Sequence, residues 1–175
     1  MNIITETDRL IIREFDEDDV LSLYKIESDH RIIKYIPWNR LSSLKECKRQ
    51  INKYISGYQR NMLNSWAVVV KETNEVIGIT QLIYSSKIRG VEIGTKIHPD
   101  YWSKGYASEL TRAVVNYGLY ELGIDEITAV TDVNNAGAIK SLINMGMSLK
   151  KYGYYNGAES AFFSVKRNNQ PQIDI

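Results

Sequence analysis

The chain has 175 residues, of which 43% are hydrophobic and 25% are charged, and a chain of this length fits one domain that buries its core without disulfides or metal ions. Its 22 Lys and Arg residues nearly balance its 21 Asp and Glu residues, and the resulting net charge of +1 argues against a nucleic-acid partner. No segment approaches the ~18 apolar residues of a membrane span, and the first residues lack the pattern of a signal peptide, so we expect neither membrane insertion nor export.

Strand and helix patterns follow one another in the first third of the chain. Residues 10–15 are rich in β-formers and predict a strand, and the acidic residues 16–19 offer N-caps for a helix. A capping-box pattern at Ser43 begins a second amphipathic helix, which we expect to end near Gly57.

Cys47 is the only cysteine, so the chain cannot form an intrachain disulfide or a thiolate metal cluster, and His30 and His98 lie far apart in the sequence. We therefore expect no metal site. Cys47 falls on the apolar stripe of the second helix, which favours a buried structural thiol over a nucleophile. The sparse use of cysteine predicts a reducing compartment, the cytoplasm.

The middle of the chain has the period of strands. Residues 66–70 and 76–83 flank a polar turn and predict an antiparallel hairpin. Residues 91–97 predict a third strand, which ends at Pro99 because proline cannot donate to the sheet.

Helix and strand patterns alternate again in the second half. Residues 107–121 carry apolar side chains at three- and four-residue steps and predict a helix, and residues 127–133 predict a strand. Asn134 or Asn135 offers the N-cap of a further helix, which Gly146 closes.

Two last strands are expected at residues 149–155 and 161–165, joined by a turn at Asn156-Gly157. The whole predicts a mixed α/β fold: one domain over residues 1–167 with about four helices, followed by a polar C-terminal tail over residues 168–175.

The stretch most informative about chemistry is residues 97–109, where a strand runs into a loop and then a helix. The first turn of a helix has unpaired N–H groups and the positive end of the helix dipole, which together favour a bound phosphate. Gly105 lets the backbone approach closely, although a glycine that only relieves a turn is the simpler alternative. The motifs G-x-x-x-x-G-K-[ST] and G-x-G-x-x-G are missing, which argues against nucleoside triphosphatases and dinucleotide dehydrogenases.

Four motifs occur in a specific order: residues 7–13, Glu92-Ile93-Gly94 with Pro99, residues 102–109, and Asn135 with Gly146-Met147. With the order of elements, they resemble the GNAT N-acetyltransferases over nearly the whole chain, in particular the RimJ/RimL-like branch of ribosomal-protein N-terminal acetyltransferases. The resemblance implies a GNAT-like fold, with a single, mostly antiparallel sheet whose central strand pair splays apart, and acetyl-coenzyme A as co-substrate.

The resemblance also implies which residues bind acetyl-coenzyme A. The pyrophosphate is expected on the backbone amides of residues 103–108, and Trp102 stands where the family has Gln or Arg. Lys104 either adds a charge toward a phosphate or is a solvated surface lysine. The pantetheine arm is expected between strands 91–97 and 127–133, where N–H groups near Ile97 polarise the thioester carbonyl. The full set of expected cofactor contacts is Ile97, Trp102, Ser103, Lys104, Gly105, Tyr106, Ala107, Ser108 and Asn135.

Glu92 and Asn135 are the expected catalytic residues. Glu92 matches a strand position from which family members direct a carboxylate to the acceptor nitrogen, and an alkyl amine needs a base at neutral pH. The alternative for Glu92 is an exposed strand residue paired with a lysine. Asn135 keeps the family's asparagine, but a simple helix N-cap explains it equally well.

The proton donor to the departing sulfur is less defined. The family's serine is replaced by Ala138, and the tyrosine of a related branch by Leu142. A thiolate with a pKa near ~8.5 is a tolerable leaving group without help. Weak substitutes for the missing donors are Ser141, Tyr152, Tyr154 and Tyr155.

The acceptor pocket is expected between residues 35–40 and the late hairpin, with Tyr35, Trp38 and Tyr154 as substrate-binding residues. Aromatic walls suit a peptide N-terminus, a polyamine or an aminoglycoside alike. The implied activity is direct transfer of an acetyl group to a primary amine in a ternary complex. The alternative is a catalytically silent coenzyme A-binding sensor or partner module, and both a monomer and a homodimer are compatible with the sequence.

Overall fold

Eight strands form one sheet in the computed structural model, which describes residues 2–36, 41–60 and 62–168. The order across the sheet is β1-β2-β3-β4-β5-β6-β8-β7, and every pairing except β5–β6 is antiparallel. The predicted mixed and mostly antiparallel sheet is therefore confirmed. The strands are β1 (Ile3–Glu6), β2 (Leu10–Arg13), β3 (Ser65–Val70), β4 (Val76–Ser85), β5 (Gly90–Ile97), β6 (Glu126–Asp132), β7 (Ser148–Tyr155) and β8 (Ala158–Lys166).

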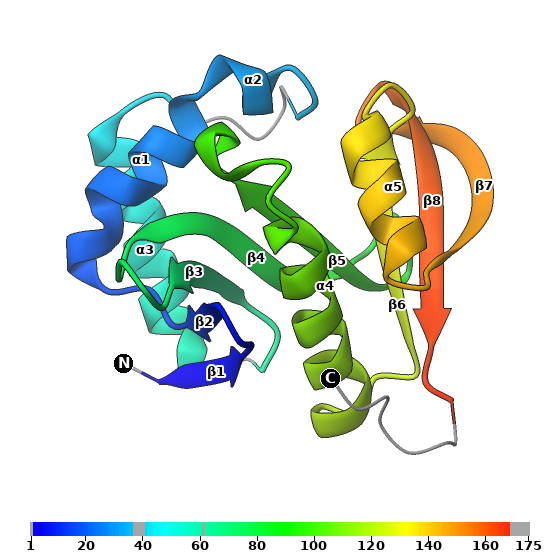
Figure 1. Cartoon of the computed structure of the whole chain (residues 1–175), viewed down its shortest axis with the longest axis horizontal. Coiled ribbons are helices and arrows are strands. Elements are labelled where there is room, and N and C mark those ends of the chain that lie inside the picture. Colours follow the sequence, from blue (N-terminus) through cyan, green and yellow to red (C-terminus); the bar gives the residue numbers. More distant parts are fainter. Residues whose placement is uncertain (1, 37–40, 61, 169–175) are drawn as a thin grey trace.

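Helices cover both faces of this sheet (Figure 1). In the described part of the chain they are α1 (Val20–Ser28), α2 (His30–Ile33), α3 (Leu44–Tyr58), α4 (Tyr106–Asn116) and α5 (Ala136–Asn144). A short 3-10 turn precedes α1 and another (Pro99–Tyr101) precedes α4, while a π-helical turn (Tyr117–Glu121) extends α4. Over the same residues, no helix combines the length and the apolar character needed to cross a membrane.

Each face of the sheet has its own core. The larger core joins α4 and α5 to the sheet through buried side chains such as Leu110, Val114 and Leu142. The smaller core joins α1 and α3 to the opposite face, and it contains Cys47, which is fully buried. Burial raises the pKa of Cys47 to about 11, which fits the predicted structural thiol.

The elements with a clear period lie within a few residues of their predicted positions. Two short elements were not predicted: β1, whose four residues Ile3–Glu6 mix apolar and polar types, and the one-turn helix α2. The expected strand 10–15 ends at Arg13, because Phe15 turns into the smaller core. These elements are too short for periodicity to identify.

The turn between β7 and β8 has the predicted hairpin geometry, since Asn156 and Gly157 have φ of 50° and 84°. Residues 169–175 lie outside the described part of the chain. The division into a domain over residues 1–167 and a tail over residues 168–175 therefore stays a prediction.

Candidate active site

The central strands β5 and β6 pair over only three residues and then separate. Val91, Glu92 and Ile93 pair with Ile127, Thr128 and Ala129 in parallel register. Beyond Ile93 and Ala129, β5 continues to pair with β4 and β6 continues to pair with β8. This is the predicted splayed pair, and Gly94 is the first residue of β5 beyond the shared register.

The open side of β5 carries backbone donors. The N–H of His98 donates to the carbonyl of Ile77, the residue after Val76 in β4, at 2.8 Å. Because successive N–H groups of a strand point to opposite sides, the N–H of Ile97 is directed toward the diverging β6. The carbonyl of Ile97 accepts a hydrogen bond of 2.7 Å from the indole of Trp102, which holds the following loop against the end of β5.

The loop from β5 to α4 leaves the N-terminus of the helix open. Gly105 is the N-cap residue with φ 82°, and no side chain of the described residues caps this end. The first helical hydrogen bond runs from the amide of Glu109 to the carbonyl of Gly105, at 3.2 Å. The amides of Tyr106, Ala107 and Ser108 therefore precede the first helical hydrogen bond, as in an anion-binding helix terminus.

The β1–β2 turn is fastened to the first turn of α4 by charged groups. Arg9 donates to the carboxylate of Glu109 at 2.7 Å and to the carbonyl of Lys104 at 3.0 Å. Its guanidinium lies 4.4 Å from the ring centroid of Tyr106. Thr7 also donates to Glu109. Burial raises the pKa of Glu109, but the hydrogen bonds from Thr7 and Arg9 outweigh it and lower the pKa.

This contact was missed by sequence reasoning, which treated residues 7–13 only as a strand motif. Arg9 and Glu109 are separated by 100 positions, and no local pattern connects them. Lys104, which the sequence offered as a phosphate ligand, lies with its ammonium 5.0 Å from the ring centroid of Tyr101.

Glu92 lies on the face of β5 toward α1 and α3 and is half-buried. Its Oε2 accepts a hydrogen bond of 2.6 Å from the hydroxyl of Tyr155, which in turn is 3.3 Å from the hydroxyl of Ser85. Burial raises the pKa of Glu92, against the opposing effects of Tyr155, Ser85 and Lys87. A raised pKa suits a carboxylate that must accept a proton.

Two neighbouring tyrosines of the late hairpin, Tyr154 and Tyr155, have different partners. Tyr154 is 74% exposed and donates to Glu159 at 3.2 Å. Tyr155, the next residue in β7, points to the other face of the strand and reaches Glu92. Tyr35 lies just after α2, with the ammonium of Lys34 5.4 Å from its ring centroid, and Trp38 lies outside the described residues.

Asn135 caps α5: its side chain accepts a hydrogen bond of 3.1 Å from the amide of Ala138. Its oxygen is therefore engaged in the N-cap that the sequence offered as the alternative, and a role toward the cofactor stays a prediction. Ser141 shares a 3.0 Å hydrogen bond with Ser108, which joins α5 to the first turn of α4. Leu142 is buried and supplies no donor.

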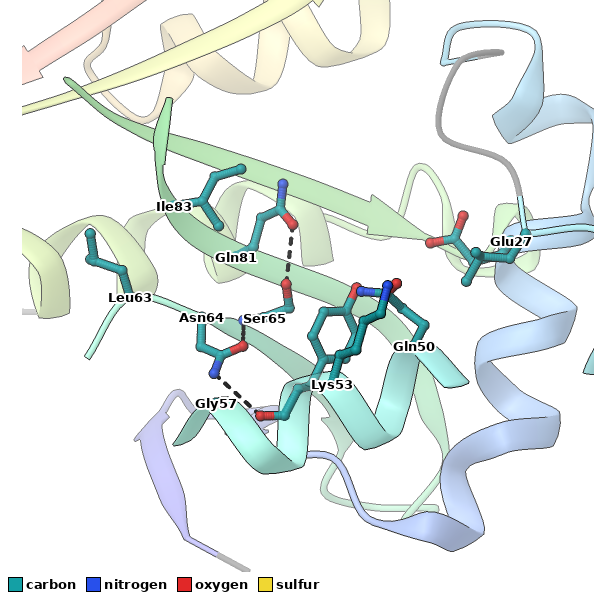
Figure 2. Close-up of a pocket in the computed structure, with 11 residues that line it drawn as sticks. Glu27, Gln50, Lys53, Gly57, Leu63, Asn64, Ser65, Gln81 and Ile83 are labelled. Atoms are coloured by element: carbon teal, nitrogen blue, oxygen red, sulfur yellow. Dashed lines mark hydrogen bonds between the residues drawn. The ribbon is translucent and has the colours of Figure 1, made fainter. Parts of the chain in front are cut away.

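A cavity of about 400 Å³ opens between α3 and the sheet (Figure 2). It lies on the same face as Glu92, because Ile83, which lines it, is directly opposite Glu92 in the β4–β5 pair. Sequence reasoning placed the acceptor near residues 35–40 and the late hairpin, and it did not predict this pocket. Its lining residues are Glu27, Leu41, Gln50, Lys53, Tyr54, Gly57, Leu63, Asn64, Ser65, Gln81 and Ile83. Among the described residues, no cluster of His, Cys, Asp and Glu could hold a metal ion.

We compared the sequence and the fold with those of known proteins. Residues 9–148 match the model of the acetyltransferase (GNAT) domain. The chain is 31% identical to the uncharacterized N-acetyltransferase YoaA of Bacillus subtilis, over 88% of this chain and 90% of that relative. A GNAT-family acetyltransferase from Bacillus anthracis has a similar structure, with a TM-score of 0.82 at 22% identity over 93% of this chain and 98% of that one.

The fold is also similar to that of RimL, a ribosomal L7/L12 α-N-protein acetyltransferase whose structure was solved in complex with coenzyme A. The TM-score is 0.80 at 16% identity, over 94% of this chain and 98% of that chain. The likeness to RimL is one of fold.

Proposed function

Because the chain belongs to the GNAT acetyltransferase family, we propose that it moves the acetyl group of acetyl-coenzyme A to a primary amine by direct attack in a ternary complex. The observation that carries this proposal is the divergence of β5 from β6 after Ile93, beside the uncapped N-terminus of α4. We place the thioester arm between the diverging strands and the diphosphate at the helix terminus, where free amides and the helix dipole favour an anion.

The proposed cofactor contacts begin at the loop. The amides of Ser103, Lys104, Gly105, Tyr106, Ala107 and Ser108 donate to the pyrophosphate. Gly105 has room for the approach, since the nearest atom to a Cβ built on it belongs to Arg9, at 3.4 Å. The guanidinium of Arg9 adds positive charge at the same place. Trp102 fixes the loop, and Nδ2 of Asn135 remains as a donor toward the arm.

In the proposed reaction, acetyl-coenzyme A supplies an activated acyl group. The N–H of Ile97 donates to the carbonyl oxygen as negative charge develops there. The amine nitrogen forms the new C–N bond, the C–S bond breaks, and Glu92 accepts the amine proton through its Oε1, because Oε2 is held by Tyr155. The sulfur leaves as a thiolate and needs no dedicated acid.

The acceptor enters from the face toward α1 and α3, where Glu92 and the 400 Å³ pocket lie. We place the chain in the RimJ/RimL-like branch, supported by the likeness of fold to RimL, and in the cytoplasm. Roles of Tyr35, Trp38 and Tyr154 toward the acceptor are part of this proposal, with Tyr155 beside Glu92.

The proposal is tested by two measurements on the purified protein. Coenzyme A should raise the melting temperature in proportion to the logarithm of its concentration, and thiol should be released from acetyl-coenzyme A when an amine is added. Stabilisation without thiol release from any amine would favour the silent module instead. No stabilisation at all would remove the proposed cofactor site.

A further inference from the structure

The 400 Å³ pocket adjoins the proposed point of acetyl transfer. Gln81 and Ile83 of β4 line it, and they lie directly opposite Gly94 and Glu92 of β5. Residues opposite each other in an antiparallel pair point to the same face of the sheet. The floor of the pocket therefore shares its face with the proposed base and with the first β5 residue beyond the β5–β6 pairing.

The hydrogen-bonding group left open on this floor is a donor (Figure 2). Oε1 of Gln81 accepts from the hydroxyl of Ser65 at 3.1 Å, which fixes the orientation of the amide. Nε2 then lies 2.8 Å from where a Cβ on Gly94 would be, and none of the described residues accepts a hydrogen bond from it. Asn64 donates one hydrogen bond to the carbonyl of Tyr54 and accepts one from the amide of Ser65, so the second N–H of its amide is a further donor.

The charges around the pocket favour an anion over a polycation. Glu27 is 5% exposed at its side chain and accepts two 2.7 Å hydrogen bonds from Lys96 of β5, so its charge is already neutralised. Lys53 of α3 stands at the rim and forms no ion pair with the described residues. Glu92, on the same face, is the proposed partner of the reacting amine. For the rest of the acceptor, Glu27, Lys96 and Lys53 leave one net positive charge, which repels the further ammonium groups of a polycation and attracts a carboxylate.

From this arrangement we propose that the acceptor is an amine that also carries a carboxylate, with Lys53 and Gln81 as the residues that determine this specificity. Lys53 pairs with the carboxylate of the substrate. Nε2 of Gln81 donates a hydrogen bond to an oxygen of the same substrate, near its reacting nitrogen. A free acidic amino acid and an acidic peptide N-terminus share this chemistry. Polyamines and aminoglycosides lack the carboxylate. The inference rests on the proposed function, since it takes the pocket to be the acceptor's.

Equilibrium binding tests the inference independently of turnover. Two labelled peptides that differ only by Asp or Lys at the second and third positions are titrated with the protein in the presence of coenzyme A, and the fluorescence anisotropy is followed. We expect a Kd at least about tenfold lower for the Asp peptide, the size of one favourable charge contact in a partly shielded site. Equal affinities, or a preference for the Lys peptide, would overturn the inference.

Two variants assign the preference to the pocket. Lys53→Glu should remove or invert it, whereas Lys48→Glu, which makes the same charge change at an exposed position of α3 outside the pocket lining, should retain it. Gln81→Glu keeps an acceptor for Ser65 but replaces the donor, and it should weaken binding of the Asp peptide. A preference that survives Lys53→Glu, or is lost equally in Lys48→Glu, contradicts the role of Lys53.

Thiol release with the same peptides, free aspartate and glutamate, spermidine and kanamycin completes the test. Faster release with the Asp peptide or with a free acidic amino acid supports the inference and identifies the source of the carboxylate. Release at equal rates from all acceptors contradicts the inference but upholds acetyl transfer. A binding preference without release from any acceptor upholds the inference about the pocket and contradicts the catalytic proposal.

Discussion

At the scale of single residues, the contact between Tyr155 and Glu92 determines how the proposed base titrates. The hydroxyl donates to the carboxylate at 2.6 Å and stabilises its charged form. Tyr155→Phe removes this donor, so the pKa of Glu92 should rise further. Because Glu92 acts when deprotonated, the acidic limb of kcat/KM should move to higher pH, by about half to one unit for a hydrogen bond worth ~1 kcal/mol.

Two variants serve as controls for this pH measurement. Tyr154→Phe removes a neighbouring hydroxyl on the other face of β7. Its proposed contact with the acceptor affects the height of the kcat/KM profile, but the pH of the acidic limb should stay unchanged. Glu92→Gln should lower kcat and abolish the limb that Tyr155→Phe shifts. The same pH profile in the wild type and Tyr155→Phe would show that Glu92 is not the base or that Tyr155 does not act on it.

The ion pair between Arg9 and Glu109 explains how the first turn of α4, the proposed diphosphate site, can contain an acidic residue. A free carboxylate there would repel a diphosphate, and Arg9 neutralises it. Arg9→Ala should therefore raise the Kd for coenzyme A by about tenfold, roughly 1.4 kcal/mol. Glu109→Gln alone should have little effect, and in the double variant it should restore most of the lost affinity.

Calorimetric titration with coenzyme A checks this prediction. Arg112→Ala, which removes an exposed positive charge from the same helix away from the contact, is the control for net charge. If Glu109→Gln fails to rescue Arg9→Ala, repulsion by the carboxylate is not the reason for the loss of affinity. Arg9 would then act through its own charge or through the position of the loop.

At the scale of elements, Gly105 is the position where the loop and α4 depend on one backbone conformation. It has φ 82°, in the left-handed region, where a side chain is strained. Gly105→Val should raise the KM for acetyl-coenzyme A by about tenfold or more, because the strain displaces the amides and the side chain crowds the diphosphate; left-handed backbone alone costs about 1–2 kcal/mol for an L residue.

Gly146→Val is a matched control for that substitution. Gly146 has φ 95° at the end of α5, and a Cβ there would meet no atom within 4 Å. Thermal denaturation should show that both variants lose stability, whereas the KM for acetyl-coenzyme A should change only in Gly105→Val. An equal rise in KM in both variants would mean that general destabilisation, rather than a change in the loop before α4, is responsible.

The same elements show how far the sequence predicts the structure. Local signals placed β5, the loop and α4, because alternation, a proline and helical periodicity each act within a few residues of the chain. Local signals could not predict the contact of Arg9 with Glu109 or that of Tyr155 with Glu92, because these residues are 100 and 63 positions apart in the sequence. The pocket over Gln81 likewise depends on the packing of α3 against β4, which no local pattern encodes.

At the scale of the whole molecule, the sheet separates two approaches to one gap. The loop and α4 lie on one face, and α1 and α3 lie on the other (Figure 1). Glu92 and the pocket belong to the face of α1 and α3. Two substrates that approach from opposite faces can be bound together. This arrangement favours direct transfer over a route through an acetylated side chain.

Steady-state kinetics distinguish the two routes. A covalent route needs a nucleophile at the gap, and the chain's only cysteine, Cys47, is fully buried in the core between α1, α3 and the sheet, with its thiol pKa raised to about 11. Double-reciprocal plots at several fixed concentrations of the amine should therefore intersect, and Cys47→Ala should retain the wild-type pattern. Parallel lines would indicate an acetylated enzyme. Transfer between two substrates bound together from opposite faces of the sheet would then be contradicted.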